Sequence, residues 1–517
     1  MVDIEKLPLD IKIGQMIMAG FPSRVYDSEI EELIKNEKVG NFILFGENLE
    51  NEKQIVELTS NLQKGINKYI KIPGIISTDQ EGGIVTRVKT TSLMFPGNMA
   101  FAAAREARST FKEGKIVGKE LRALGINMNL APVMDVNCNS RNPVIGTRSY
   151  GDNPKKVAEL GVDLIKGLKE SLVISVAKHF PGHGDTEVDS HLNLPTVKHK
   201  LDRLNRVELF PFKVAIKEGI DAIMSAHVLF ETIEPNKLPS TLSSRVLTGL
   251  LRGKLGFEGM IITDCMEMDA IAKVYGSDKA AVMAIKAGAD LICISHTAAV
   301  QKACIHAIKT AVKNGEISEQ RINESVRRIL KTKEKYRISE SISKNKYNHN
   351  NFFIEKISDR SITVLKDDKK LIPLKGKCIF IATKAAALTG AEDKIKEENI
   401  FISKAYEKFG GNKFEMQINP NKASINRIVK ECTKADRVVI GLYNASNNSG
   451  QREIVHEINK VNPNIVLVAL RNPYDYLYFK DFSTYINVYD YTSMSVKSVI
   501  KVLAGEIKAL GVSPIEL

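Results

Sequence analysis

Eight short apolar runs recur through the first 300 residues, and stretches with helical periodicity lie between them. The runs are Met16–Phe21, Gly40–Phe45, Gly74–Thr78, Asn127–Val133, Val173–Ala177, Ile220–Ser225, Gly259–Thr263 and Ala289–Ile294. The helix-like stretches include Glu29–Glu37, Gln54–Ile66, Ala102–Leu124, Pro154–Lys169, Leu204–Glu218 and Ala280–Ala287. Such alternation predicts βαβ units and a parallel sheet, whose strands are buried on both faces and therefore read as continuous hydrophobic runs. Eight units within roughly 330 residues favour a (β/α)8 TIM-type barrel, and a doubly wound sheet is the alternative.

The length of the chain requires a second domain, because 517 residues exceed what one ordinary core supports. Residues 338–351 (ISESISKNKYNHNN) are polar and weakly periodic, which is typical of a linker. We therefore predict a catalytic barrel over residues 1–337 and a smaller C-terminal α/β/α sandwich over residues 352–517. The expected strands of the sandwich are Ile362–Leu365, Cys378–Ala382, Val438–Leu442, Ile465–Leu470 and Tyr485–Val488.

Polar residues stand at the C-terminal ends of six of the eight predicted barrel strands. They are Asp79, Asp135, Lys178 with His179, His227, Asp264 and His296. In a barrel all of these ends share one rim, and barrel enzymes build their active sites there. The sequence therefore predicts an active site at this rim.

Composition limits the classes of partner. No apolar run reaches the ~18 residues that a membrane span needs, and the N-terminus has no basic and apolar segments typical of a secretory signal. The six cysteines are scattered without metal-site spacing, so we expect reduced thiols and a cytoplasmic location. The net charge of +13 is spread along the chain without a nucleic-acid motif, so we expect neither nucleic acid nor membrane as a partner. The sequence carries no signal of the oligomeric state.

A loop rich in histidine and aspartate follows the fifth predicted strand. It begins at Lys178 and reads KHFPGHGDTEVDSH up to His191, and it continues without periodicity to about Thr196. Loops of this length inside a compact domain are usually functional or disordered. One hypothesis is a metal-dependent barrel hydrolase, with His179, His183, Asp185 and His191 as zinc ligands. Against it, barrel active sites draw their groups from several strand ends, whereas these residues lie mostly on one loop.

Five motifs occur in an order that resembles glycoside hydrolase family 3, in its β-N-acetylglucosaminidase (NagZ-like) branch. They are Asp79-Gln-Glu-Gly-Gly with Arg87, Asn142-Pro-Val-Ile-Gly-Thr-Arg148-Ser, the loop Lys178 to Thr186 with Asp189-Ser-His191, Ser225-Ala-His227, and Ile262-Thr-Asp264. Together they cover the whole predicted barrel. The resemblance implies a retaining exo-enzyme that releases terminal β-linked GlcNAc, with peptidoglycan-derived GlcNAc-(anhydro)MurNAc fragments as typical substrates. It implies no cofactor and no metal.

The resemblance assigns Asp264 as the nucleophile and His191 as the general acid/base, with Asp189 orienting the imidazole. Retaining hydrolysis needs a carboxylate on one face of the sugar and a proton donor for the leaving oxygen. A histidine titrates close to neutral pH, and a carboxylate on its other ring nitrogen fixes the tautomer. The alternative role for Asp264 is to cap a following helix over Glu267–Val274.

The resemblance also implies that five residues bind the terminal sugar: Asp79, Arg87, Arg148, Lys178 and His179. Charged groups of this kind recognise a fixed set of hydroxyls through charge-assisted hydrogen bonds.

Arg148 has an alternative role as the ion-pair partner of Asp135. His227 either lines the pocket or satisfies neighbouring carbonyls. The second domain need not enter the site, because the barrel loop already supplies the acid.

A phosphorylase of the same branch is a second hypothesis, because a neutral histidine does not repel an incoming phosphate.

Overall fold

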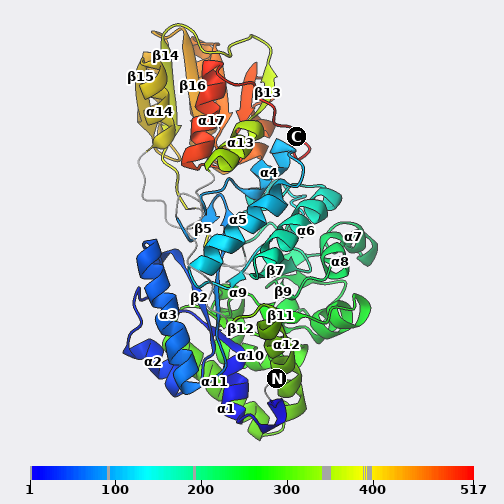
Figure 1. Cartoon of the computed structure of the whole chain (residues 1–517). Coiled ribbons are helices and arrows are strands. Elements are labelled where there is room, and N and C mark those ends of the chain that lie inside the picture. The colour runs from blue at the N-terminus through cyan, green and yellow to red at the C-terminus, as the bar shows by residue number, and fades with distance from the viewer. Residues whose placement is uncertain are drawn as a thin grey trace.

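Residues 3–89, 93–189, 194–339, 351–387, 389–390, 392 and 399–517 are described by the computed structural model (Figure 1). The first part of the chain forms one eight-stranded parallel sheet in the order β11-β9-β7-β6-β3-β2-β1-β12. Its strands are β1 (Ile17–Ala19), β2 (Asn41–Leu44), β3 (Ile75–Thr78), β6 (Met128–Asn129), β7 (Ile174–Phe180), β9 (Ala222–Ser225), β11 (Met260–Thr263) and β12 (Ile292–Ile294). A parallel bridge between Ile262 and Leu291 joins the two end strands. The predicted barrel is therefore confirmed, and the doubly wound sheet is wrong.

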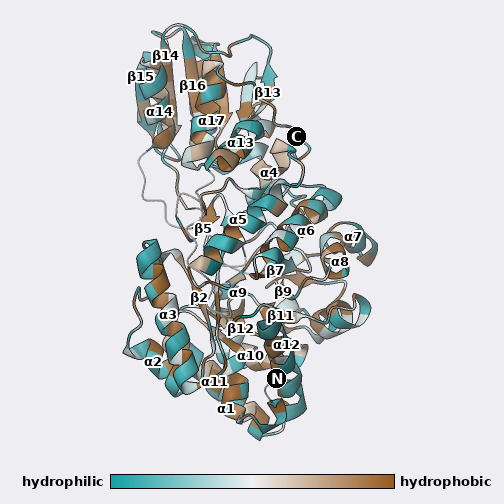
Figure 2. Cartoon of the chain, viewed as in Figure 1, coloured by the Kyte–Doolittle hydropathy of each residue, from teal (hydrophilic) through white to brown (hydrophobic). Residues whose placement is uncertain are grey.

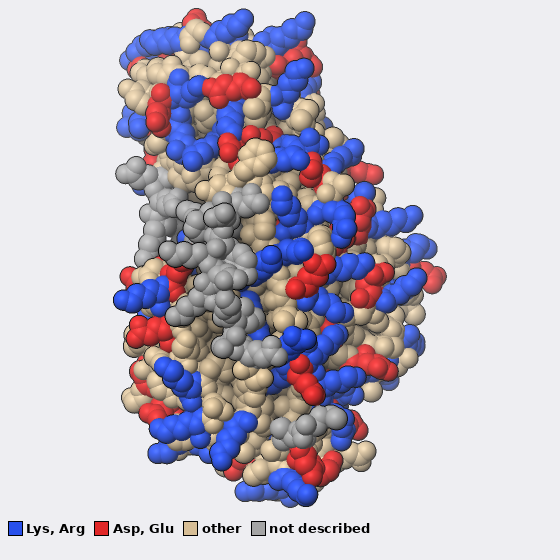
Figure 3. Space-filling model, viewed as in Figure 1, with Lys and Arg blue, Asp and Glu red and all other residues tan. Residues whose placement is uncertain are grey.

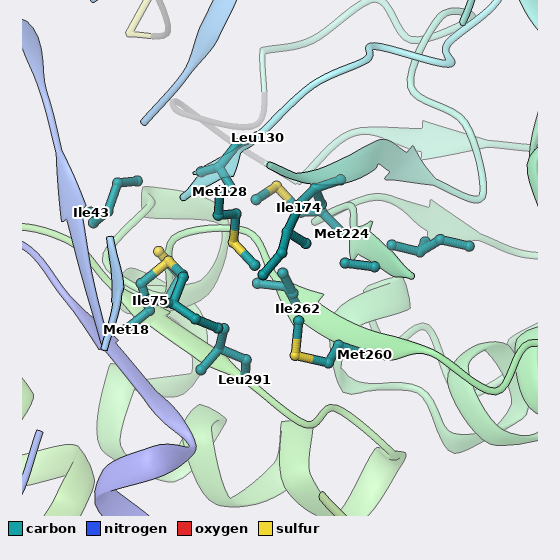
Figure 4. Close-up of a cluster of buried hydrophobic side chains, with 14 of the residues drawn as sticks. Met18, Ile43, Ile75, Met128, Leu130, Ile174, Met224, Met260, Ile262 and Leu291 are labelled. Carbon is teal, nitrogen blue, oxygen red and sulfur yellow. The ribbon is translucent and has the colours of Figure 1, made fainter. Parts of the chain in front are cut away.

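Apolar side chains from the strands fill the barrel interior. Figure 4 shows Met18, Ile75, Met128, Ile174 and Ile262 converging from different strands into one cluster, and all of these side chains are buried. Hydrophilic residues lie mainly on the outer helices in Figure 2, while the strands are largely hydrophobic. This distribution explains why the sequence pattern predicts the barrel: burial of both faces of the sheet requires the continuous apolar runs.

Thirteen helices of five or more residues accompany the described part of the barrel. They are α1 (Leu9–Gln15), α2 (Ser28–Lys35), α3 (Glu52–Tyr69), α4 (Asn98–Ala104), α5 (Ser109–Ala123), α6 (Pro154–Glu170), α7 (Leu201–Arg206), α8 (Phe210–Lys217), the helix Arg245–Lys254, α9 (Asp269–Tyr275), α10 (Ser277–Ala287), α11 (Ala298–Lys313) and α12 (Glu319–Lys335). Several begin where the sequence indicates. The Asn153 side chain accepts hydrogen bonds from the first turn of α6, and Pro154 follows it as the first helical residue.

Two predicted helices are each divided in the structure. The stretch Ala102–Leu124 is split into α4 and α5, and both Arg105 and Arg108 at the break have positive φ, at 48° and 52°. The stretch Leu204–Glu218 is split into α7 and α8. Helical periodicity continues across both breaks, so hydrophobic pattern alone does not reveal them.

The second domain is a six-stranded sheet with helices on both faces, as predicted. Its strand order is β13-β18-β17-β16-β14-β15, and only β13 is antiparallel to its neighbour. The strands are β13 (Thr363–Asp367), β14 (Cys378–Thr383), β15 (Asn412–Met416), β16 (Arg437–Leu442), β17 (Ile465–Ala469) and β18 (Thr484–Asn487). The helices α14 (Ile400–Phe409) and α17 (Ser493–Ala504) share one hydrophobic cluster, and α15 (Lys422–Cys432) and α16 (Ser449–Val461) share the other. The edge strand β15 was not predicted, because three of its five residues are exposed and polar.

A small apolar interface joins the second domain to the barrel. Met99 and Ala103 of α4 pack against Tyr474, Tyr489 and Ile515. In Figure 1, α4 lies beside α13 (Asn351–Ser361) at the junction of the two domains. The predicted boundaries stay a prediction, since residues 340–350 lie outside the described part of the chain.

No helix within the described residues is long and apolar enough to cross a membrane. Lysine and arginine side chains are distributed over both domains on the face shown in Figure 3, with acidic side chains among them.

Two glycines allow α5 and α6 to pack closely. A Cβ on Gly167 would lie 2.2 Å from the carbonyl oxygen of Phe111 and 2.9 Å from the Cα of Gly114. Gly167→Ala should therefore destabilise the protein by about 1–3 kcal/mol through overpacking. Urea or thermal unfolding measures the loss. Gly249→Ala is the matched control, because its nearest atom is 3.7 Å away, and it should be neutral or stabilising. Equal midpoints for the two variants would contradict this account of the helix contact.

Candidate active site

A cavity of about 920 Å³ opens at the C-terminal ends of the barrel strands. Six of the eight predicted site residues line it: Asp79, Arg87, Arg148, Lys178, His179 and Asp264. They come from the ends of β3, β7 and β11 and from two loops between barrel strands, so one pocket collects residues that are far apart in sequence. Asp189 is buried on the loop after β7, and His191 lies outside the described residues.

A buried carboxylate, Glu81, organises the cations on one wall of the pocket. Its oxygens accept hydrogen bonds from Nε and Nη2 of Arg148 at 2.9 and 2.8 Å, and the Nζ of Lys178 lies 2.6 Å from Oε1. The same Nζ donates to Oδ1 of Asp79 at 2.6 Å. The two cations and two carboxylates thus form one chain of ion pairs. The predicted alternative pair between Arg148 and Asp135 is wrong, because Glu81 receives the Arg148 guanidinium.

The pKa values follow from this arrangement. Burial alone would raise the pKa of Glu81, but the charges of Arg148 and Lys178 outweigh it and hold the pKa below its usual range. Burial would likewise lower the pKa of Lys178, but Asp79 and Glu81 raise it above its usual value. Glu81, Arg148 and Lys178 are therefore charged at neutral pH, and this wall of the pocket presents fixed ionic groups.

His179 is oriented by a second buried carboxylate, Asp135. The Nδ1 of His179 lies 2.6 Å from Oδ2 of Asp135. The carboxylate oxygens of Asp135 also accept hydrogen bonds from the backbone N–H groups of His179 and His183. The Nε2 of His179 lies 3.4 Å from a guanidinium nitrogen of Arg148. A cation already stands beside the ring nitrogen that a metal would need, which argues against the zinc hypothesis.

Asp264 stands where the buried strand β11 ends. The backbone N–H of Cys265 donates to its Oδ1 at 2.8 Å. The next helix, α9, begins at Asp269 with Met268 as its N-cap residue, so the alternative role of Asp264 as a helix cap is wrong. The carboxylate is instead held by its own turn and lines the pocket.

His227 lies beneath the pocket rather than in its lining. Its Nδ1 is 2.9 Å from Oγ1 of Thr241, and its Nε2 is 2.9 Å from the carbonyl oxygen of Cys265. Two roles were predicted for His227, lining the pocket or satisfying neighbouring carbonyls. The structure shows the latter, because the ring contacts a carbonyl oxygen. That carbonyl belongs to the residue after Asp264, so His227 helps to fix the turn that presents the carboxylate.

The described part of the histidine loop is tied to the barrel by its first residues. His183 is buried, and its Nδ1 lies 2.8 Å from Oγ1 of Thr186. Asp185 instead forms a hydrogen-bonded pair with His199. Within the described residues, the proposed zinc ligands thus point to different partners and do not converge on one point.

Sequence reasoning missed two acidic residues of the pocket. Glu81 was visible in the motif, because Asp79 and Glu81 are two apart and side chains two apart share a face in extended chain. The second is Glu392, which reaches the pocket with Gly390 from the C-terminal domain. Arg471 holds the Glu392 carboxylate at 2.6 and 3.0 Å. The expectation that the second domain need not enter the site is therefore wrong, and no local pattern at Glu392 indicates its position.

An aromatic pair forms another part of the lining. The rings of Phe45 and His296 are stacked with their centroids 5.2 Å apart, and the Arg87 guanidinium lies 5.5 Å from the Phe45 ring centre. His296 was predicted at the rim, whereas Phe45 is the last residue of an apolar run and carried no functional signal.

The buried His183 predicts a pH dependence of stability. Burial lowers its pKa from 6.5 to about 4. Between these values the unfolded chain binds a proton that the folded protein does not, so the free energy of unfolding falls as the pH is lowered from about 6.5 to about 4, by about 3 kcal/mol. His183→Gln should remove this part of the acid destabilisation, as urea unfolding at pH 7 and pH 4.5 would measure. His306→Gln, at an exposed position of α11, should retain the wild-type pH dependence. Parallel pH curves for wild type and His183→Gln would contradict the assignment.

Comparison with known proteins identifies the family of the chain. The model of the "Glycosyl hydrolase family 3 N terminal domain" matches residues 8–332. The chain is 36% identical over 329 residues to "Beta-hexosaminidase A" of Pseudoalteromonas piscicida, a match that covers 59% of this chain and 55% of that protein. It is 33% identical over 293 residues to "Beta-hexosaminidase" of Neisseria meningitidis serogroup C (strain 053442), covering 54% of this chain and 77% of the relative.

Solved structures also resemble the whole chain. One of them is a glycoside hydrolase family 3 β-N-acetylglucosaminidase from Paenibacillus sp. str. FPU-7, with a TM-score of 0.93, 37% identity and 99% of both chains covered. The chain therefore belongs to glycoside hydrolase family 3, as a member of its group of β-N-acetylglucosaminidases and β-hexosaminidases.

Proposed function

We propose that the protein is a retaining exo-β-N-acetylglucosaminidase, with Asp264 as the nucleophile and the His191/Asp189 pair as the general acid/base. The observation that carries the proposal is the placement of Asp264 in one pocket with the ionic cluster of Asp79, Glu81 and Lys178. Such a pocket offers both a carboxylate for covalent catalysis and fixed charges that can bind sugar hydroxyls.

The position of Asp264 suits a nucleophile. A strand end inside the barrel rim fixes the carboxylate, while the cavity leaves it open to a sugar. The N–H of Cys265 donates to Oδ1, which favours the ionised form that attack on the anomeric carbon requires. Attack forms a glycosyl-enzyme ester and releases the aglycone, and water then cleaves the ester with retention of configuration.

The position of the loop after β7 suits an acid/base on the same rim. β7 and β11 are both paired in parallel with β9, so their C-terminal ends lie on the same side of the barrel. Asp189 is buried, and a buried carboxylate next to a histidine can fix its tautomer and stabilise the imidazolium. His191 would donate a proton to the leaving oxygen in the first step and take one from water in the second.

We propose that the charged residues on one wall of the pocket, here called the ionic wall, bind the terminal sugar. Asp79 has a partly exposed carboxylate beside Lys178. We propose that this carboxylate accepts hydrogen bonds from the hydroxyls at C4 and C6 of the sugar. Arg87, Arg148, Lys178 and His179 would supply donors. Because Glu81 and Asp135 already hold several of these groups, they are ordered before substrate arrives, which reduces the entropic cost of binding.

A peptidoglycan-derived aglycone is the substrate class that we favour. Arg24 and Lys89 are exposed on the lining of the pocket, with Arg24 lying 3.5 Å from Glu50. The lactyl and peptide groups of muropeptides carry carboxylates, and exposed cations such as these can pair with them. The relative from Paenibacillus is a β-N-acetylglucosaminidase, which supports the proposed sugar specificity.

A substrate panel tests the activity. We expect hydrolysis of aryl β-GlcNAc, little turnover of aryl β-glucose, and faster cleavage of GlcNAc-anhydroMurNAc than of N,N′-diacetylchitobiose at low salt. In phosphate buffer the product should be free GlcNAc. Release of GlcNAc-1-phosphate would establish the phosphorylase alternative, and a preference for glucosides would overturn the proposed specificity.

Two variants test the assigned roles with one pair of substrates. His191→Ala should lower the rate on a natural disaccharide by about 10²–10⁴-fold, because the leaving oxygen then lacks its proton donor. The same variant should retain more activity on aryl glycosides with good leaving groups. Asp264→Asn should abolish turnover of both substrates. Equal losses in His191→Ala would remove that residue from the acid role, and substantial residual turnover in Asp264→Asn would exclude it as the nucleophile.

A further inference from the structure

A second cluster of potential ligands lies at the base of the histidine loop, outside the pocket lining. Cys138 belongs to the loop after β6, Asp185 to the loop after β7, and Glu208 to the connection between α7 and α8. One ligand atom from each residue lies within 4.8 Å of the others. Asp185 is also paired with His199.

One carboxylate oxygen in this cluster has no hydrogen-bond partner among the described residues. Glu208 is 2% exposed, and the oxygen in question is its Oε2. Its Oε1 accepts from Nη1 of Arg203 at 2.7 Å, and Nη2 of Arg203 lies 3.3 Å from the Sγ of Cys138. A buried carboxylate oxygen without a donor is costly, and its presence in a native protein commonly indicates an ion or water.

The packing around Glu208 also brings it close to the loop. Gly182 has φ at 139°, and a Cβ at this position would lie 2.9 Å from the Cβ of Glu208. The glycine therefore lets the carboxylate approach the base of the loop. Both Cys138 and Asp185 are partly exposed, which provides a path for an ion from solvent.

We propose that Cys138, Asp185 and Glu208 form a binding site for a thiophilic divalent cation of the Zn²⁺ or Co²⁺ type. One sulfur and two carboxylate ligands suit these ions, whereas Mg²⁺ and Ca²⁺ prefer oxygen ligands alone. Closure of the ligands around such an ion requires a contraction on the order of 1 Å from the present spacing. His199 supports Asp185 as an outer partner, in the way that histidine and carboxylate pairs commonly surround metals.

Arg203 competes with the ion in this site. Its guanidinium now contacts both Glu208 and Cys138, and it is partly exposed, so it can move outward when a cation enters. Removal of Arg203 should therefore strengthen metal binding, an effect that loss of folding cannot produce. An occupied site would connect the loops after β6 and β7 to the α7–α8 connection.

Titration of the full-length, chelator-treated protein with Co²⁺ tests the site. We expect one Co²⁺ per chain, a thiolate-to-cobalt charge-transfer band and a rise in the unfolding temperature. Cys138→Ser should abolish the band. Glu208→Gln and Asp185→Asn should weaken binding by at least about 10–100-fold. Arg203→Met should tighten binding about tenfold.

Cys265 supplies the matched control, because it is the other partly exposed cysteine of the barrel and lines the catalytic pocket. Cys265→Ser should retain the band. The proposal is overturned if the wild type shows no band, if Cys138→Ser keeps it, or if Cys265→Ser loses it. Binding that is insensitive to Arg203→Met would equally contradict the competition on which the site depends.

Discussion

The pocket depends on a buried carboxylate that holds two cations in place. Glu81 is almost inaccessible to solvent, and so are the side chains of Arg148 and Lys178 that it contacts. Charges are expensive to bury, and they persist in a protein only where pairing and hydrogen bonds compensate the lost hydration. Because the three residues come from the β3, β6 and β7 segments, their ion pairs also fix these segments relative to one another. The buried ion pairs thus join loops from three parts of the chain into one rigid wall of the pocket.

The turn after β11 is likewise positioned by a buried side chain from a neighbouring strand. His227 comes from the end of β9, and its ring contacts both Thr241 and the carbonyl oxygen of Cys265. These contacts below the turn help to position Asp264, while the ion pairs of Glu81 form the neighbouring wall of the pocket. Catalytic groups held in advance need little reorganisation during a reaction, which is the main source of electrostatic catalysis in enzymes.

The sequence reveals the barrel well because both faces of its sheet are buried, and few folds place eight continuous apolar strands in alternation with amphipathic helices. It reveals breaks in helices poorly, since the left-handed residues Arg105 and Arg108 interrupt a pattern that remains apolar on one face. The pocket residues on strand ends were predictable from topology and from the family resemblance. Glu392 was not, because its position depends on how the second domain packs on the barrel and on its pairing with Arg471. The roles of Asp264, Asp189 and His191 stay predictions.

The contact of the second domain with the barrel has a consequence for the shape of the pocket. The N–H of Gly97 donates to the buried Asp490 at 3.1 Å, and the hydroxyl of Tyr474 donates to the carbonyl oxygen of Asn137 at 2.9 Å. Both bonds hold the domain that carries Glu392 against the barrel, so they help to place this residue in the pocket lining. Sequence changes at this junction can therefore reshape the pocket from the side of the second domain while Asp264 and the ion pairs of Glu81 keep their geometry. The lining of the pocket is thus built in two parts whose sequences can vary independently.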